Sequence, residues 1–219
     1  MKTIRNLATA TAIMLGTAGL ASAQTLNFAY DADPVSLDPH EQLSGGTLQL
    51  SHMVFDPLVR WTQDLQFEPR LAESWEQIDG TTMRFKLRSG VTFHDGTPFD
   101  AEAVKANIER SKTLPESRRK SEVKSIESVE VSGPLQVKFN LTAPDATLLA
   151  QFADRSGMMM SPTAAAAAGA DFGANLVCSG PFKFVEYERG QYVMAVKNDD
   201  YWREGYPYLD RIVWRFIIW

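Results

Sequence analysis

The sequence has 219 residues, of which 44% are hydrophobic and 22% charged, and its formal net charge is −5. This ordinary globular composition supplies enough apolar side chains for one or two packed domains. An acidic chain is a poor match to a nucleic-acid-binding protein, so we expect no nucleic-acid partner. The short basic run Arg118-Arg119-Lys120 is expected to be a solvated helix surface.

Residues 1–23 have the pattern of a secretory signal peptide. Lys2 and Arg5 precede an apolar run from Leu7 to Leu20, and the small-x-small sequence Ala21-Ser22-Ala23 follows it. A spanning helix needs roughly 20 apolar residues, so this shorter run disfavours a membrane anchor. We therefore predict cleavage before Gln24 and a soluble periplasmic protein.

The first element expected after the signal peptide is a strand over Leu26 to Tyr30, where apolar and polar residues alternate. The turn-rich segment Asp31 to Pro34 ends it. Gly45-Gly46 then precedes a helical run that continues through Val54 and is closed by Pro57.

The middle of the chain predicts strands over Met83 to Leu87 and over Val91 to Phe93. Asp95-Gly96 is a turn, and Asp100 is placed as the N-cap of a helix that runs to about Lys112. Later residues predict two hairpins, two short helices and two apolar strands. These are the strand pairs 126–131/135–141 and 182–188/191–197, the helices 146–152 and 164–168, and the strands 158–160 and 211–219.

The strand Arg211 to Trp219 is almost wholly apolar, which predicts a central place in a sheet with both faces covered. A chain that stops inside such a strand suggests a truncated product or a fragment.

The stretch Phe67 to Arg110 closely resembles the signature region of solute-binding protein family 5, which includes oligopeptide-, dipeptide-, glutathione- and nickel-binding proteins. The matching positions are Pro69, Leu71, Ala72, Ser74, Trp75, Gly80, Phe85, Leu87, Arg88, Gly90, Val91, Phe93, His94, Asp95, Gly96, Pro98, Phe99, Ala101 and Val104. Further blocks that resemble the family in the same order are Leu37-Asp38-Pro39, Val54 to Val59, Ser161-Pro162, Gly180-Pro181-Phe182 and Tyr201-Trp202.

The resemblance implies an α/β fold of the periplasmic-binding-protein-like II type that is incomplete. Its first lobe would carry the family-specific subdomain, and its second lobe would be absent. The core lobe is expected over roughly 24–50 and 178–219, and the inserted subdomain over roughly 51–177.

The function implied is that of the substrate-binding component of an ABC importer. It would bind peptides or similar small solutes without an enzymatic step or a cofactor, as a monomer that delivers its ligand to the membrane permease. The alternatives are a nickel-type metal-chelate-binding protein and a secreted hydrolase, although no nucleophile motif supports the hydrolase.

One block departs from the family, whose members usually read Asn-Pro-Val-Gly-Thr-Gly-Pro where this chain has Asn175 to Pro181. Cys178, the single cysteine of the chain, stands where the family has a glycine. Losing a glycine can forbid a positive φ or a close backbone approach, so the geometry of this crossing is left open. The cysteine itself is more often a buried inert residue than a reactive thiol.

Seven residues are candidates for ligand binding, namely Tyr30, Asp31, Asp33, Ser44, Gly45, Arg155 and Met158. The aspartates follow the first strand, where ligands of open α/β sheets tend to bind, but they could equally cap the loop. Arg155 could clamp a ligand carboxylate or lie on the surface, and Met158 could line a plastic binding wall or belong to the core.

We expect no catalytic and no metal-binding residues. His94 and Asp95 are adjacent in a tight turn, which favours a structural turn over general acid–base chemistry. His40, His52 and His94 lack the spacing of metal ligands.

Overall fold

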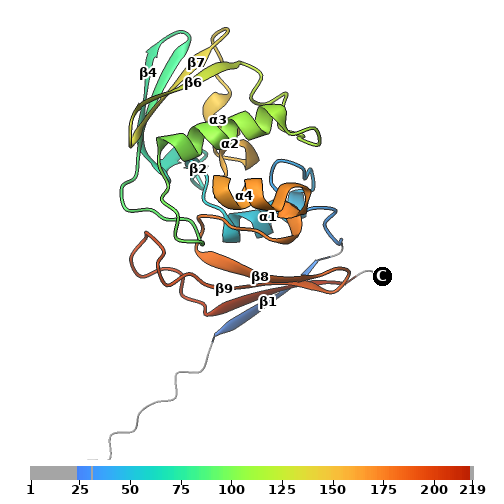
Figure 1. Ribbon diagram of the computed structural model, residues 1–219. Helices are drawn as coiled ribbons and strands as arrows, with labels where there is room; N and C mark the ends of the chain where they lie inside the picture. The colour runs from blue at the N-terminus through green and yellow to red at the C-terminus, as the bar shows by residue number, and fades with distance from the viewer. Residues whose placement is uncertain (1–23, 31, 218–219) are drawn as a thin grey trace, which may run out of the picture.

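The computed structural model describes residues 24–30 and 32–217, and the predicted signal peptide lies outside these residues. Two four-stranded sheets form the ends of the molecule, with helices between them (Figure 1). In the lower sheet the order is β1 (Thr25–Tyr30), β10 (Arg211–Phe216), β9 (Tyr192–Lys197) and β8 (Phe182–Glu188). In the upper sheet it is β4 (Ala72–Asp79), β5 (Thr82–Leu87), β7 (Gln136–Leu141) and β6 (Ile126–Gly133).

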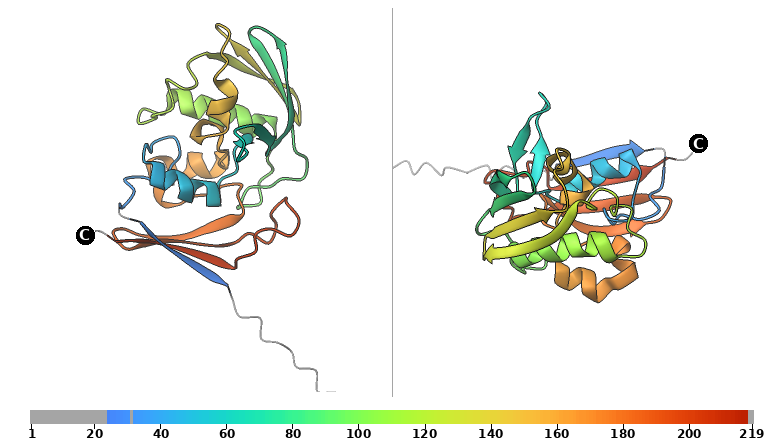
Figure 2. Two further views of the ribbon diagram at one scale, coloured as in Figure 1. Left: turned by 180° about the vertical axis from the view of Figure 1, so that it is seen from behind. Right: turned by 90° about the horizontal axis from the view of Figure 1, so that it is seen from above.

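The helices fill the space between the sheets, and a small hairpin projects from the body (Figure 2). The helices are α1 (Gly45–Val54), α2 (Ala101–Thr113), α3 (Leu148–Phe152) and α4 (Pro162–Ala168), with short 3₁₀ turns over Arg155–Gly157 and Gly169–Ala174. The projecting hairpin pairs β2 (Val59–Trp61) with β3 (Phe67–Pro69). No helix among the described residues is long and apolar enough to cross a membrane.

The upper sheet is antiparallel and owes its core to strict alternation. In β5, Met83, Phe85 and Leu87 are buried while the residues between them face solvent. The rings of Phe85, Phe139 and Phe152 pack with centroids 4.9 to 5.6 Å apart. These contacts fix the sheet on α3, and Val104 and Ile108 of α2 join the same first core.

The lower sheet holds the only parallel pair of strands in the described chain, β1 with β10. The prediction that the last strand is central is confirmed, since β10 lies between β1 and β9. Ile212, Trp214 and Phe216 face a second core that includes residues of α1. The expectation of two covered faces is only partly met, because Arg211 and Arg215 are exposed.

Several predicted elements are confirmed, including both hairpins and the helix from Ala101 to Thr113. Two predicted strands are wrong. Residues 91–93 and 158–160 form single bridges instead, Thr92 with Pro98, Pro57 with Met158 and Met160 with Cys178. Met158, Met159 and Met160 are all fully buried because this segment runs between the two cores. The division into a core lobe and an inserted subdomain, with boundaries near residues 50 and 178, stays a prediction.

Asp100 is the N-cap of α2, as its position before the helical pattern predicts. Its carboxylate accepts a hydrogen bond of 2.9 Å from the backbone N–H of Ala103. We expect Asp100→Ala to lower the free energy of unfolding by about 1 kcal/mol, since an unsatisfied N–H is left at the helix start. Urea denaturation measures this change. The control Asp199→Ala alters a side chain that is 84% exposed and should change stability by less than about 0.5 kcal/mol; equal losses in the two variants would contradict the capping role.

Candidate functional site

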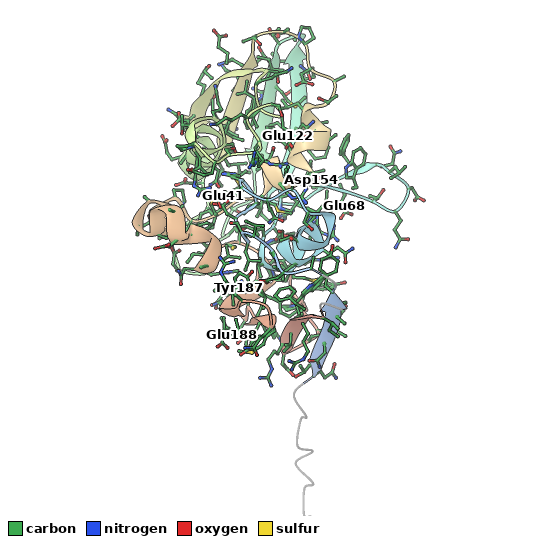
Figure 3. All side chains as sticks on the ribbon, turned by 90° about the vertical axis from the view of Figure 1, so that its right-hand side faces the viewer. Glu41, Glu68, Glu122, Asp154, Tyr187 and Glu188 are labelled. Atoms are coloured by element: carbon green, nitrogen blue, oxygen red, sulfur yellow. The ribbon has the colours of Figure 1, made fainter. Side chains whose placement is uncertain are left out.

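The candidate site lies at the edge of the lower sheet where β1 and β10 both end. The two strands run parallel, so Tyr30 and Phe216 are partners at the same edge, beside the last described residues at the right of Figure 1. Clefts of open α/β sheets lie at the carboxyl ends of such strands. Figure 3 faces this side of the molecule and shows α1 above β1.

Tyr30 is brought onto the start of α1. Its half-buried ring lies 6.1 Å from the ring of Trp214 and fills the space next to Gly46. A Cβ atom added at Gly46 would lie 1.7 Å from Cζ of Tyr30, so only glycine permits this contact. Sequence reasoning did not include Gly46 among the site residues, although the Gly45-Gly46 pair was the signal that pointed to it.

The N-terminus of α1 is open to solvent. Ser44 is its N-cap, and within the described chain the Ser44 side chain makes no capping hydrogen bond. Ser44 and Gly45 are exposed, and the first turn contains no acidic residue. The first backbone N–H groups of a helix lack intrahelical partners and carry the positive end of the helix dipole. This end of α1 can therefore accept a carboxylate or another hydrogen-bond acceptor.

Arg155 holds this helix start in place. Its side chain is only 8% exposed, and its Nη2 donates to the backbone oxygen of Ser44 at 2.5 Å. Nη1 donates to Oδ1 of Asp154 at 3.3 Å, and Asp154 lies beside α1 in Figure 3. The surface alternative for Arg155 is therefore wrong, because its side chain is buried and bonded to the start of α1. Burial lowers the pKa of the guanidinium.

A buried polar network that sequence reasoning missed supports the same region. Arg119 donates to Oε1 of Glu122 at 2.5 Å and to the backbone oxygen of Gln42 at 3.0 Å. Ser156 donates to the other oxygen of Glu122 at 2.6 Å. The expectation of a solvated helix surface over residues 118–120 is met only in part: Arg118 and Lys120 are exposed, but the segment is not helical and Arg119 is 3% exposed. The sequence of a basic run does not indicate which of its residues is buried or which acceptors it bonds.

The remaining candidates for ligand binding do not lie together at the start of α1. The Asp33 carboxylate accepts hydrogen bonds from the Tyr187 hydroxyl at 2.8 Å and from the Gly190 backbone N–H at 3.0 Å. It therefore joins the loop to the β8–β9 hairpin, which favours the capping alternative. Burial, and then the bond to the Asp33 carboxylate, raise the pKa of Tyr187. Met158 is fully buried in the second core, which favours the core alternative. Asp31 lies outside the described residues.

A hollow of about 390 Å³ opens beside the start of α1. Its lining includes Gln42, Ser44 and Thr47 together with the charged residues Glu41, Glu116 and Arg118. Glu41 is labelled on this side in Figure 3. The walls thus offer both signs of charge and hydrogen-bonding groups beside apolar surface from Val35 and Leu43, which suits a small solute that carries an amino and a carboxylate group on an apolar body.

His94 is held by backbone groups. Its Nδ1 accepts from the Cys178 N–H at 3.4 Å, so the hydrogen on Nε2 donates to the Gly180 carbonyl at 3.0 Å. Burial lowers the pKa of the ring to about 4, consistent with this neutral form. The Asp95 carboxylate accepts from Thr97 and from the Ser161 hydroxyl. These bonds confirm the predicted structural turn.

The backbone at Cys178 does not need the positive φ that a glycine would allow. Cys178 is fully buried and has no positive φ, since Leu65 is the only described non-glycine residue with one. Burial raises the pKa of its thiol well above the ordinary value. The close approach falls on Gly180, where an added Cβ would lie 2.5 Å from the carbonyl carbon of Val54. No group of three or more metal-binding side chains occurs among the described residues.

Comparison with known proteins gives a family and several relatives. Residues 66–218 match the model of bacterial extracellular solute-binding proteins, family 5 Middle. The glutathione-binding protein GsiB of Pectobacterium atrosepticum is 33% identical over 186 residues, which cover 84% of this chain and 36% of that protein.

Two solved structures share the fold. The periplasmic binding protein AgaA of A. tumefaciens R10, in complex with agropinic acid, superposes with a TM-score of 0.83 at 30% identity; 88% of this chain and 40% of that one are covered. NikZ of Campylobacter jejuni, in complex with Ni(L-His), has a TM-score of 0.79 at 27% identity, with 88% and 39% covered. The chain thus spans about two fifths of the length of the proteins it matches.

Proposed function

The chain belongs to family 5 of the bacterial extracellular solute-binding proteins, and from this premise we propose that it is part of the substrate-binding component of an ABC importer. In this proposal it binds a peptide or a similar small solute in the periplasm, after cleavage of its signal peptide, and acts as a monomer that delivers the solute to the membrane permease.

The observation that carries this proposal is the uncapped N-terminus of α1 at the edge where β1 and β10 end. Peptides and glutathione carry free carboxylates, and exposed helix N–H groups bind such groups well. We propose that Ser44 and Gly45 present these groups to the solute and that Tyr30 forms a wall. Arg155 acts as a positioning residue through the backbone oxygen of Ser44.

The other candidates complete the proposed wall. Asp31 follows Tyr30 directly and is kept as a contact residue, whereas Asp33 shapes the loop through its bonds to the β8–β9 hairpin. Met158 supports the site from the core rather than by touching the solute.

A metal chelate is the second candidate ligand, because NikZ, which shares the fold, is in complex with Ni(L-His). A metal chelate of an amino acid also presents carboxylate oxygens, so the N-terminus of α1 could bind it in the same way. A hydrolase is disfavoured, because both ring nitrogens of His94 already contact backbone groups.

The test replaces Gly45, where an added Cβ meets no atom within 4 Å. An aspartate here suits the helix dipole but repels an anionic solute, so Gly45→Asp should weaken glutathione or dipeptide binding about tenfold without lowering stability. Gly45→Ala is the matched control and should bind like the parent.

Binding is followed by calorimetry and by amide NMR shifts of residues 44–47, with glutathione, dipeptides and nickel–histidine as probes. A response to nickel–histidine alone would favour the chelate. Turnover of an ester or a peptide, or equal binding by both Gly45 variants, would contradict the proposal.

A further inference from the structure

A second hollow lies at the other end of α1 from Ser44. It has a volume of about 270 Å³, and its walls include His52 of the last turn of α1, Arg60 of β2 and Arg70 beyond β3. The β9–β10 loop closes it with Arg203, Tyr206 and Tyr208. This loop lies on the side of Figure 1 opposite the C-terminal end, so the hollow is separate from the proposed solute site.

Arg70 is a buried cation with unused hydrogen-bonding capacity. It is 7% exposed, and its Nη2 pairs with Oε1 of Glu68 at 3.1 Å. Its Nε is buried and has no partner among the described residues. This Nε is itself inaccessible, so an oxyanion in the hollow would meet the terminal N–H groups of the Arg70 guanidinium, which lines the hollow.

Arg60 and Arg203 add two exposed cations at the rim. The guanidinium of Arg203 lies over the ring of Tyr206 at 4.1 Å, and this stacking leaves the N–H groups at its edge free. Stacking also holds the side chain in one orientation, which reduces the entropy lost on binding.

The charges around the hollow sum to a positive value. Asp56 lines it, but its Oδ2 accepts from the Tyr201 hydroxyl and the Trp202 N–H, both at 2.7 Å. The positive groups are the guanidinium groups of Arg60, Arg70 and Arg203. The negative groups are the carboxylates of Asp56, in the lining, and of Glu68, which is paired with Arg70. The sum is one positive charge. Burial and the charge of Arg60 lower the pKa of His52 to about 4, so its ring is neutral near pH 7.

The non-polar part of the walls is aromatic. The rings of Tyr206 and Tyr208 lie with centroids 4.7 Å apart, and Tyr208 is 72% exposed. We propose that this hollow is a binding site for a small oxyanion, a carboxylate or phosphate group held by Arg60, Arg70 and Arg203, with the body of the ligand against Tyr206 and Tyr208.

The test titrates the purified full chain with inorganic phosphate and, separately, with benzoate, at constant ionic strength and with chloride as the reference. We expect saturable binding of at least one anion, weakened about tenfold in Arg203→Gln and in Arg60→Gln, as for the loss of one charge-assisted hydrogen bond. Both arginines are exposed, so the variants should fold. Arg84→Gln, at an exposed arginine of the upper sheet, should bind like the parent.

The two probes separate the sources of the anion, since phosphate alone indicates a tetrahedral group and benzoate a carboxylate. Gly45→Asp should leave this binding unchanged, which keeps the result independent of the proposed solute site. Absence of saturable binding, an equal response to chloride, or full binding by the double variant Arg60→Gln/Arg203→Gln would overturn the proposal.

Discussion

The protein is expected to lose stability steeply as the pH falls from about 6.5 to 4. His40, His52 and His94 are all buried or half-buried, and burial lowers the pKa of each from 6.5 to about 4. Because the folded pKa lies below the unfolded value, their contribution to stability is complete above pH 6.5 and is lost as the pH falls towards 4. Three protons taken up on unfolding give a slope of up to about 4 kcal/mol per pH unit.

Urea denaturation at intervals between pH 8 and pH 4 measures this slope. In His94→Gln the amide can still donate to the Gly180 carbonyl but takes up no proton, so the slope should fall by about a third. A slope that is unchanged in this variant, or a stability that is flat across the interval, would show that these rings are protonated without penalty. The lowered pKa values of Asp95 and Asp145 extend the loss to more acidic pH.

Asp38→Asn is expected to lower the free energy of unfolding by about 3 kcal/mol, because it leaves a largely buried guanidinium without its counter-charge. The Asp38 side chain is 0% exposed, and its Oδ2 accepts from Nη2 of Arg110 at 2.6 Å. Its Oδ1 accepts from the His40 N–H at 2.8 Å, and the ring of His40 contacts Arg110 and Ser111. The substitution therefore disturbs the whole cluster.

The control is an ion pair of the same length on the surface. Arg84 and Glu76 also lie 2.6 Å apart, with side chains that are 47% and 61% exposed. Solvent screens such a pair, so Glu76→Gln should cost no more than about 1 kcal/mol. Urea denaturation of both variants at pH 7 compares them directly. Similar losses would mean that burial does not strengthen the Asp38–Arg110 interaction.

This pair gives the Leu37-Asp38-Pro39 block a physical role. The loop between β1 and α1 carries the candidate site, and Arg110 belongs to α2. The ion pair therefore fixes that loop to a helix whose apolar face packs in the other core.

The sequence predicted the elements that have a strong local pattern. The alternation of Met83, Phe85 and Leu87 predicts β5, and Asp100 predicts the start of α2. β4 was missed because only Ala72 of its eight residues is fully buried, so its alternation is weak. Three consecutive apolar methionines favour a strand. In the structure the segment 158–160 is buried on both sides but pairs with its neighbours only through single bridges.

Some residues of the candidate site can be grouped from their place in the chain, whereas others cannot. Tyr30, Ser44 and Gly45 could be grouped because the chain itself brings them to one edge. Arg155 and Arg119 could not be placed, since their partners Ser44 and Gln42 lie 111 and 77 residues away. Nothing in the local pattern of a charged residue identifies such a distant acceptor.

The parallel pairing of β1 with β10 has a consequence for the order of folding. The Gln24 N–H bonds Oδ2 of Asp210 across 186 residues of chain, so the first strand of the lower sheet cannot pair until the far end of the described chain is available. The upper sheet needs only residues 72–141, and we expect it to form first, before β1 finds β10.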